Sequence, residues 1–164
     1  MEAESTLAPK SWKIRSFHPS DVGAFGALAD ISLSSPEASQ FSAGDYHGIA
    51  CTEGGILLLC EWDAHICGFL AGRQAAGEAE ILNFAVHPRF RRLGIASALL
   101  SAALTEFTEK GIASVFLEVR ESNSPALSLY QKFGFAIASR RKDYYRDPLE
   151  DGLCLMRKLP ALAS

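Results

Sequence analysis

The segment from Arg89 to Ser97 has residue types that could hold an anion. It joins a strand-like run, which ends at Pro88, to a helix-like run. The first turn of a helix leaves backbone N–H groups unpaired and carries the positive end of the helix dipole, so it attracts negative charge. Gly94 and Ala96 would let a phosphate approach the backbone closely, and three arginines add positive charge: Arg89, Arg91 and Arg92. The pattern favours a pyrophosphate over a lone carboxylate, although a solvated basic loop has the same composition.

This segment differs from two common phosphate-binding motifs. It has no Gly-Lys-Ser/Thr sequence, which excludes a P-loop. It also lacks Gly-x-Gly-x-x-Gly, and a proline ends the preceding strand, which excludes the dinucleotide fingerprint. The anion therefore belongs to another kind of cofactor.

Glu118 is a carboxylate inside an apolar run, residues 114–121. A charge in such a strand is unfavourable unless it is paired or has a function. Because this run ends near the predicted anion site, we interpret Glu118 as a general base that acts through a water molecule. The alternative is a structural ion pair with Arg120 or Arg141.

The hydrophobic pattern predicts the elements that position these residues. Strands are expected at 11–17, 54–62, 65–74, 78–88, 113–121, 135–145 and 152–159, and helices at 21–35, 36–50, 93–110 and 124–133. Ser20 or Asp21 is expected to cap the first helix, and Ser124 the last one. A strand, a crossover helix and a strand near residues 80–120 predict one parallel pair. The fold class is therefore α/β (α+β), a mostly antiparallel twisted sheet of about seven strands with a central parallel pair and about four helices.

Composition limits the kind of protein. The chain has 164 residues, 48% hydrophobic and 21% charged, which suits a soluble globular protein with one core. A net charge of −3 argues against non-specific binding to nucleic acid. No apolar run approaches the roughly 18–20 residues of a membrane helix, and the N-terminus lacks the pattern of a secretory signal, so we expect a cytoplasmic protein that binds no membrane. The four cysteines have no metal-ligand spacing, so we expect no metal site. Residues 1–10 are expected to be a flexible tail and residues 11–160 a single domain.

Three segments resemble the GNAT superfamily of N-acetyltransferases. Residues 91–96, Arg-Arg-Leu-Gly-Ile-Ala, resemble its signature (Q/R)-x-x-G-x-(G/A), with Ala96 in place of the commoner second glycine. Residues 117–135 resemble its second cofactor segment, and residues 140–145 its penultimate strand. The resemblance extends from Glu80 to Pro160 and is closest to the bacterial ribosomal-protein-alanine N-acetyltransferases. Residues 34–46, which usually shape the acceptor site, lack the proline-tryptophan pair often found there.

The resemblance implies acetyl-CoA as co-substrate and assigns roles to particular residues. Its pyrophosphate would lie on Arg91, Arg92, Leu93, Gly94, Ile95, Ala96 and Ser97. Its pantetheine arm and acetyl group would lie along the backbone of Phe84, Ala85 and Val86 and beside Asn123. Tyr130 would be the general acid, and the resemblance supports Glu118 as base. From the residues alone, Tyr130 and the strand at 84–86 could equally belong to the core, and Asn123 could be a turn residue.

The candidate acceptor residues lie near the C-terminus. The resemblance makes Tyr144 or Tyr145 a wall of the acceptor groove, and both could instead be surface aromatics. Glu150 and Asp151 are either turn residues or groups that attract a basic peptide. The resemblance implies the N-terminal alanine of a small-subunit ribosomal protein as acceptor. Alternatives are a small amine, an antibiotic or a lysine side chain, or a non-catalytic module that binds acyl-CoA.

Overall fold

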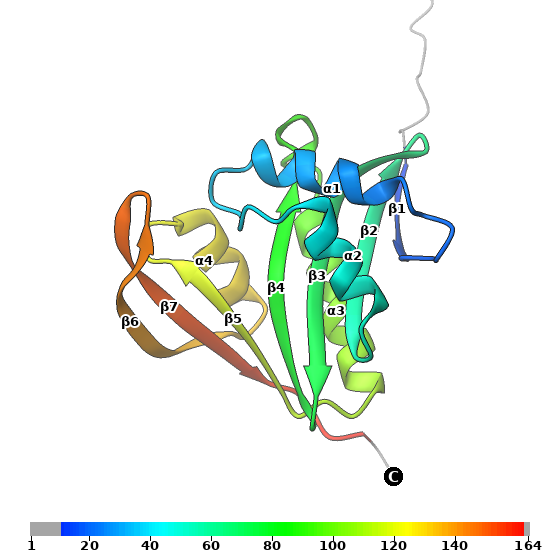
Figure 1. Cartoon of the computed structure of the whole chain (residues 1–164). Coiled ribbons are helices and arrows are strands. Elements are labelled where there is room, and N and C mark those ends of the chain that lie inside the picture. Colours follow the sequence, from blue (N-terminus) through cyan, green and yellow to red (C-terminus); the bar gives the residue numbers. More distant parts are fainter. Residues whose placement is uncertain (1–10, 163–164) are drawn as a thin grey trace, which may run out of the picture.

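A computed structural model describes residues 11–162. Its seven strands form one sheet in the order β1-β2-β3-β4-β5-β7-β6 (Figure 1). The strands are β1 (Trp12–Ser16), β2 (Gly55–Trp62), β3 (His65–Ala75), β4 (Glu78–Val86), β5 (Ser114–Arg120), β6 (Ala136–Arg146) and β7 (Leu149–Lys158). The helices are α1 (Ala24–Leu33), α2 (Ala43–Cys51), a short 3₁₀ helix (Pro88–Phe90), α3 (Ile95–Glu109) and α4 (Ser124–Lys132). The predicted fold class and order of elements are confirmed, whereas the expected tail at residues 1–10 lies outside the described residues.

Two apolar cores lie on opposite faces of the sheet. In β2, Ile56 and Leu58 pack with α3 on one face, and Leu57 and Leu59 pack with α1 and α2 on the other. Burial on both faces explains why this strand is a continuous apolar run rather than an alternating one. In Figure 1, α1 and α2 lie in front of β2 and β3, and α3 lies behind them. No helix of the described residues is long and apolar enough to cross a membrane.

The single parallel pair joins β4 to β5, as predicted. Pairing runs only from Glu78 opposite Ser114 to Ile81 opposite Leu117. β7 then lies between β5 and β6, and all other strand pairs are antiparallel. This short pairing leaves the carboxyl-terminal ends of β4 and β5 apart.

Several predicted element ends are wrong. The N-cap of α1 is Gly23, not Ser20 or Asp21, because the Asp21 carboxylate instead binds Arg15. The N-cap of α4 is Asn123, one residue before the expected Ser124. The second helix starts at Ala43 rather than near residue 36, so residues 34–42 form a loop.

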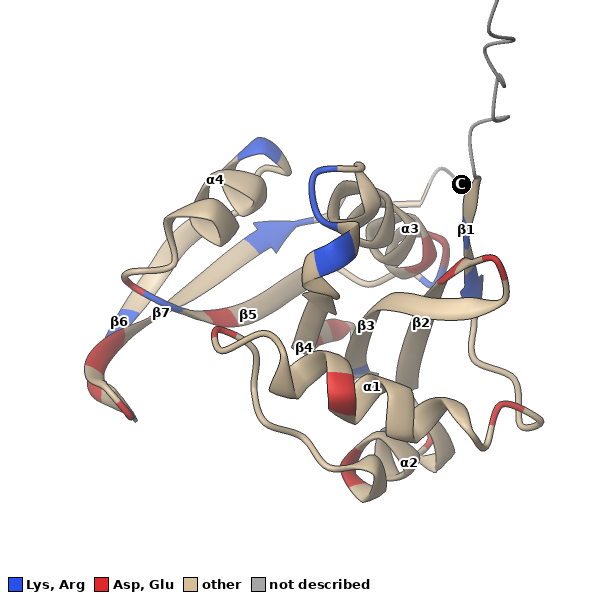
Figure 2. Cartoon of the chain, turned by 90° about the horizontal axis from the view of Figure 1, so that it is seen from above, with Lys and Arg blue, Asp and Glu red and all other residues tan. Residues whose placement is uncertain are grey.

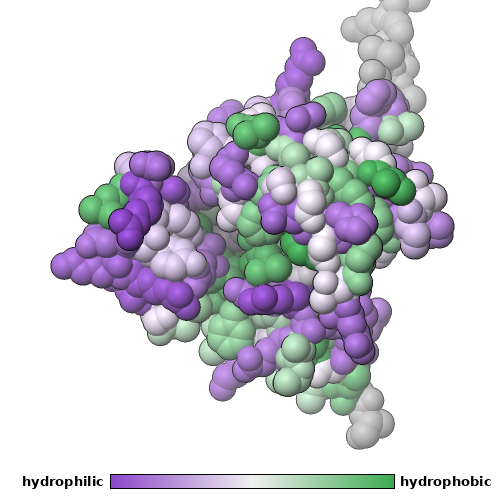
Figure 3. Space-filling model, viewed as in Figure 1, coloured by the Kyte–Doolittle hydropathy of each residue, from purple (hydrophilic) through white to green (hydrophobic). Residues whose placement is uncertain are grey.

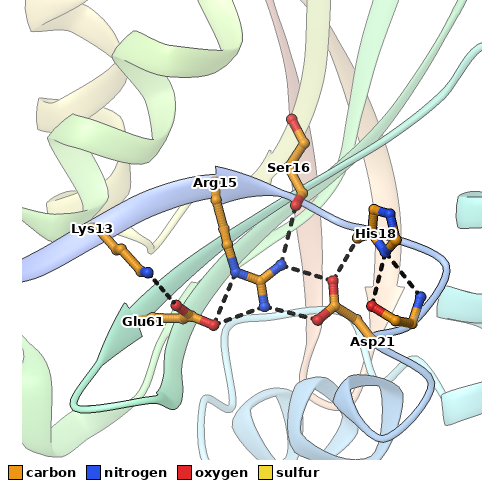
Figure 4. A network of polar contacts seen from close by, with 7 residues as sticks. Lys13, Arg15, Ser16, His18, Asp21 and Glu61 are labelled. Carbon is orange, nitrogen blue, oxygen red and sulfur yellow. Dashed lines mark hydrogen bonds and ion pairs between the residues drawn. The ribbon is translucent and has the colours of Figure 1, made fainter.

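An ion-pair network links β1 to β2 and to the segment that precedes α1 (Figure 4). The Arg15 guanidinium donates to both Asp21 carboxylate oxygens, at 2.7 and 2.8 Å, and through Nε to Glu61 Oε1 at 2.9 Å. These contacts lower the pKa of Asp21 and of Glu61 below their ordinary values. A carboxylate whose pKa is lower in the folded state stabilises the protein above the unfolded pKa, about 4, and loses this contribution as pH falls through the folded pKa.

We therefore predict that Arg15→Met lowers the melting temperature at pH 7, and that the difference from wild type shrinks as pH falls from about 4 towards 2. Thermal unfolding followed by circular dichroism across this range measures it. Arg73→Met removes a more exposed pair with Glu80 and should change stability little at either pH. A difference for Arg15→Met that stays constant with pH would contradict the prediction.

Candidate active site

A cleft of about 960 Å³ lies between the separated ends of β4 and β5. In β4, Asn83 pairs with Ala71 and Ile81 pairs with Gly72, so Leu82 is an extra residue that forms a bulge. The bulge comes directly after the last pair with β5, where β4 turns away from its neighbour. Besides the two strands, the cleft is lined by the loop at residues 35–40, the start of α3, one side of α4 as far as Tyr130, and Tyr145 of β6.

The start of α3 forms one end of the cleft. Arg92 and Gly94 have positive φ, 63° and 81°, a conformation that glycine adopts readily. No side chain caps the helix, and its first backbone acceptor, Gly94 O, receives the N–H of Ala98 at 3.1 Å. The preceding N–H groups, of residues 95–97, therefore have no acceptor within the helix, and these residues line the cleft. Figure 2 shows the basic residues gathered on the loop that leads into this helix.

The predicted anion-binding residues line the cleft with one exception. Residues 94–97 line the cleft together with Arg92. Arg91 lines it too, but its guanidinium donates to Ser35 Oγ at 3.3 Å and to Val86 O at 3.4 Å, so it also joins the loop to β4. Leu93 is 45% exposed and lies outside the lining.

Glu118 and Tyr130 line the same cleft, from β5 and α4. Tyr130 is buried and its ring lies between those of Phe84 and Phe135, with centroids 6.4 and 5.6 Å away. Burial raises the pKa of Tyr130, so its hydroxyl stays protonated at neutral pH. The Glu118 carboxylate is 3.1 Å from Arg141 Nε, which is one of the two ion-pair partners expected from the sequence.

All but one of the remaining predicted residues line the cleft. Phe84, Ala85, Val86 and Asn123 line the cleft, and Asn123 also accepts the N–H of Ala126 at 3.3 Å. Tyr145 lines the cleft, and burial raises its pKa to about 12. Tyr144 is 44% exposed and packs edge-on against Tyr145.

Glu150 and Asp151 are held by the protein itself. Glu150 accepts from Arg120 at 3.2 Å and from the Ser122 N–H at 2.8 Å. Asp151 accepts from Arg140 at 3.1 Å and from the Asp143 N–H at 2.9 Å. These partners favour the structural interpretation of both carboxylates. Within residues 11–162, no three His, Cys, Asp or Glu side chains are grouped so that they could hold a metal ion.

Sequence reasoning missed Asn83, which joins the loop at residues 35–40 to β4. Its Nδ2 donates to Ser39 O and to the Tyr46 hydroxyl, both at 2.8 Å, and its Oδ1 accepts the Ser39 N–H at 3.2 Å. The Tyr46 hydroxyl is also hydrogen-bonded to Ser32 in α1. One buried side chain thus ties the loop at 35–40 to β4. A polar residue in the apolar run "EILNFAV" was the available signal, of the same kind that identified Glu118.

The seven-stranded sheet, with a cleft between two parted parallel strands and the start of a helix, defines a class of acyltransferase. The family model "Acetyltransferase (GNAT) family" matches residues 26–135. The chain belongs to this family, and it is an acetyl-CoA-dependent N-acetyltransferase.

Two relatives and one crystal structure are similar to this chain. A Bacillus subtilis (strain 168) protein, provisionally named as a ribosomal protein bS18-alanine N-acetyltransferase, is 34% identical over 124 residues, 73% of this chain and 82% of the relative. The Escherichia coli (strain K12) enzyme of that name is 43% identical over 75 residues, 46% of this chain and 49% of the enzyme, so this alignment spans about half of its length. The crystal structure of the Escherichia coli ribosomal-protein-S18-alanine N-acetyltransferase superposes with a TM-score of 0.80 at 27% identity, over 94% of this chain and 97% of that one.

Proposed function

We propose that this protein transfers the acetyl group of acetyl-CoA to the α-amine of a protein N-terminus, and that its acceptor is the N-terminal alanine of a small-subunit ribosomal protein. The observation that carries the proposal is that Glu118 and Tyr130 line one cleft, which is also lined by the uncapped start of α3. The names of the relatives support the acceptor, since they act on alanine of ribosomal protein bS18.

The parted strands offer a place for the cofactor. We assign the N–H groups of residues 95–97, with Arg92, to the pyrophosphate. The His87 N–H donates to Cys67 O in β3 at 2.8 Å, and successive N–H groups of a strand alternate in direction. The Val86 N–H therefore points away from β3, towards the cleft, where it can bind the pantetheine arm or the thioester carbonyl. The Phe84 N–H points the same way, but it donates to Asn83 Oδ1 at 3.1 Å.

The two catalytic side chains serve the two proton transfers of the reaction. The acceptor arrives as an ammonium ion and gives one proton to Glu118 through a water molecule. The freed lone pair attacks the thioester carbon, and the carbon–sulfur bond breaks. The nitrogen loses its second proton as the amide forms, and this proton replaces the one that the Tyr130 hydroxyl donates to the leaving thiolate. Because an ordinary tyrosine has a pKa of about 10 and a thiol about 8.5, this last step requires transfer that is concerted with bond cleavage.

The basicity of the acceptor favours an α-amine over lysine. At neutral pH on the order of 10–20% of an α-amine is already free base, against well under about 1% of a lysine, because their pKa values are about 7.7–8.0 and 10.4. One carboxylate acting through water is sufficient for the first group.

Release of free thiol from acetyl-CoA tests the acceptor. We would compare a short peptide that starts with alanine followed by basic residues with the same peptide carrying a blocked α-amine and an internal free lysine. Turnover on the free N-terminus alone is expected. Turnover on the lysine peptide, or on neither peptide while acetyl-CoA still binds, would overturn the proposed acceptor.

If the start of α3 binds the pyrophosphate, a negative charge placed there should weaken the binding of acetyl-CoA. Ala96→Glu places a carboxylate next to the proposed pyrophosphate, and we expect it to raise the KM for acetyl-CoA by about tenfold or more through charge repulsion. Ala96→Gln has a side chain of nearly the same size without charge, so it separates repulsion from steric hindrance. Equal KM values for wild type and both variants would show that the pyrophosphate lies elsewhere.

A further inference from the structure

The side chain of Glu118 faces the side of the sheet opposite α3 and α4. In β5, Val115, Leu117 and Val119 are buried in the core with these helices, so the alternate residues point to the other face. Figure 3 shows this side of the molecule, which is hollowed between the polar β6–β7 side and the body that carries α1 and α2.

An irregular part of β6 covers Glu118 from that side. Arg141 pairs with Gly152 and Tyr145 pairs with Glu150, so three residues of β6 lie opposite a single residue of β7. Within this bulge Asp143 has a φ of 51°. The Tyr144 ring turns back over Gly152, where an added Cβ would lie only 3.0 Å from Tyr144 Cδ1, so a larger residue at this position would require the ring to shift.

Arg141 supplies the positive charge next to Glu118. Its Nε is 3.1 Å from Glu118 Oε1, and its guanidinium carbon is 5.3 Å from the centroid of the Tyr144 ring. The proximity of Glu118 also raises the pKa of Tyr144. Arg141 is 57% exposed in its side chain and Glu118 only 22%. The carboxylate is thus the fixed partner, and the arginine is the partner with room to leave.

The other charged and titratable groups around Glu118 have their own partners or carry no positive charge. Arg120 binds Glu150 and covers the Tyr145 ring, and Arg140 binds Glu121 and Asp151. Glu80 on β4 pairs with Arg73. Cys154 on β7, directly opposite Glu118 in the sheet, is a free thiol. Among these described neighbours, Arg141 is the cation that neutralises Glu118.

We propose that Arg141 and Tyr144 form a displaceable cap over Glu118, and that the ammonium group of the acceptor takes the place of the Arg141 guanidinium. This inference rests on the proposed function, in which Glu118 is the base for an amine. A neutral group that displaced Arg141 would leave a partly buried carboxylate without its counter-ion, whereas a cation keeps it paired. The acceptor therefore enters in its ammonium form, and its proton passes through a water molecule to Glu118 only after the exchange.

Removal of the competing cation tests the cap. Arg141→Gln should lower the KM for the alanine peptide by about two- to fivefold, the range expected for one exposed ion pair, with the KM for acetyl-CoA unchanged. Arg141→Lys keeps the charge and should retain a KM close to that of wild type. Lys142→Gln removes an adjacent positive charge that has no contact with Glu118 and serves as the matched control.

The cap is overturned if Arg141→Gln leaves the peptide KM unchanged or raises it, if Lys142→Gln lowers it equally, or if Arg141→Lys lowers it as far as Arg141→Gln does. Failure of the proposed function is a different result, because it appears in wild type as turnover on another class of amine and none on the N-terminal peptide. The same variants are then compared on the amine that wild type accepts, and the same changes in KM decide the question.

Discussion

Glu118→Gln is expected to lower kcat by about 10²- to 10⁴-fold, the usual range for loss of a general base. Glutamine has nearly the shape of glutamate but cannot take a proton from the acceptor. The side chain is not part of the proposed pyrophosphate site at the start of α3, so the KM for acetyl-CoA should change little. Steady-state thiol release with the alanine peptide measures both constants.

Glu80→Gln is the matched control for this variant. Glu80 belongs to the neighbouring strand, opposite Phe116 in β5, and pairs with Arg73. The Glu80→Gln substitution removes one carboxylate from the same side of the sheet and leaves the residues that line the cleft unchanged. A loss of kcat below tenfold for Glu118→Gln, or an equal loss for Glu80→Gln, would assign Glu118 to the structural ion pair that the sequence also allowed.

The parts of the site that the sequence predicted depend on local physics. Gly94 is a residue that readily adopts the left-handed conformation at a helix start, and Glu118 is a charge where the strand pattern calls for an apolar residue. Both signals lie within a few residues of sequence. The N-cap of α4 was predicted one residue too late because Asn123 and Ser124 are both good N-cap residues, and local preference does not choose between neighbours.

The parts that were not predicted depend on contacts between distant segments. The cleft opens because Leu82 bulges out of β4, and a bulge leaves no strong mark in an apolar run. Asn83 and Ser39 are joined across 44 positions of sequence. The choice of Arg141 over Arg120 as partner of Glu118 depends on the placement of β7 between β5 and β6 and on the three-residue bulge in β6. Hydrophobic periodicity fixes none of these.

Tyr130→Phe is expected to lower kcat by about 10²-fold without loss of stability. The ring stays packed between Phe84 and Phe135, and only the proposed proton donor is removed. Among the described residues the Tyr130 hydroxyl has no hydrogen-bond partner, so its removal leaves no other group unsatisfied.

Tyr46→Phe is the matched control, because Tyr46 is also buried but its hydroxyl is hydrogen-bonded to Asn83 at 2.8 Å and to Ser32. Removing it leaves buried polar groups without a partner, which costs about 1–3 kcal/mol and lowers the melting temperature, while kcat should fall far less than in Tyr130→Phe. The two variants delete the same atom from two buried tyrosines, so a hydroxyl used in catalysis and one used in folding give opposite patterns of kcat and melting temperature. A stable Tyr130→Phe enzyme with wild-type kcat would remove the general acid from the mechanism and leave protonation of the thiolate to water.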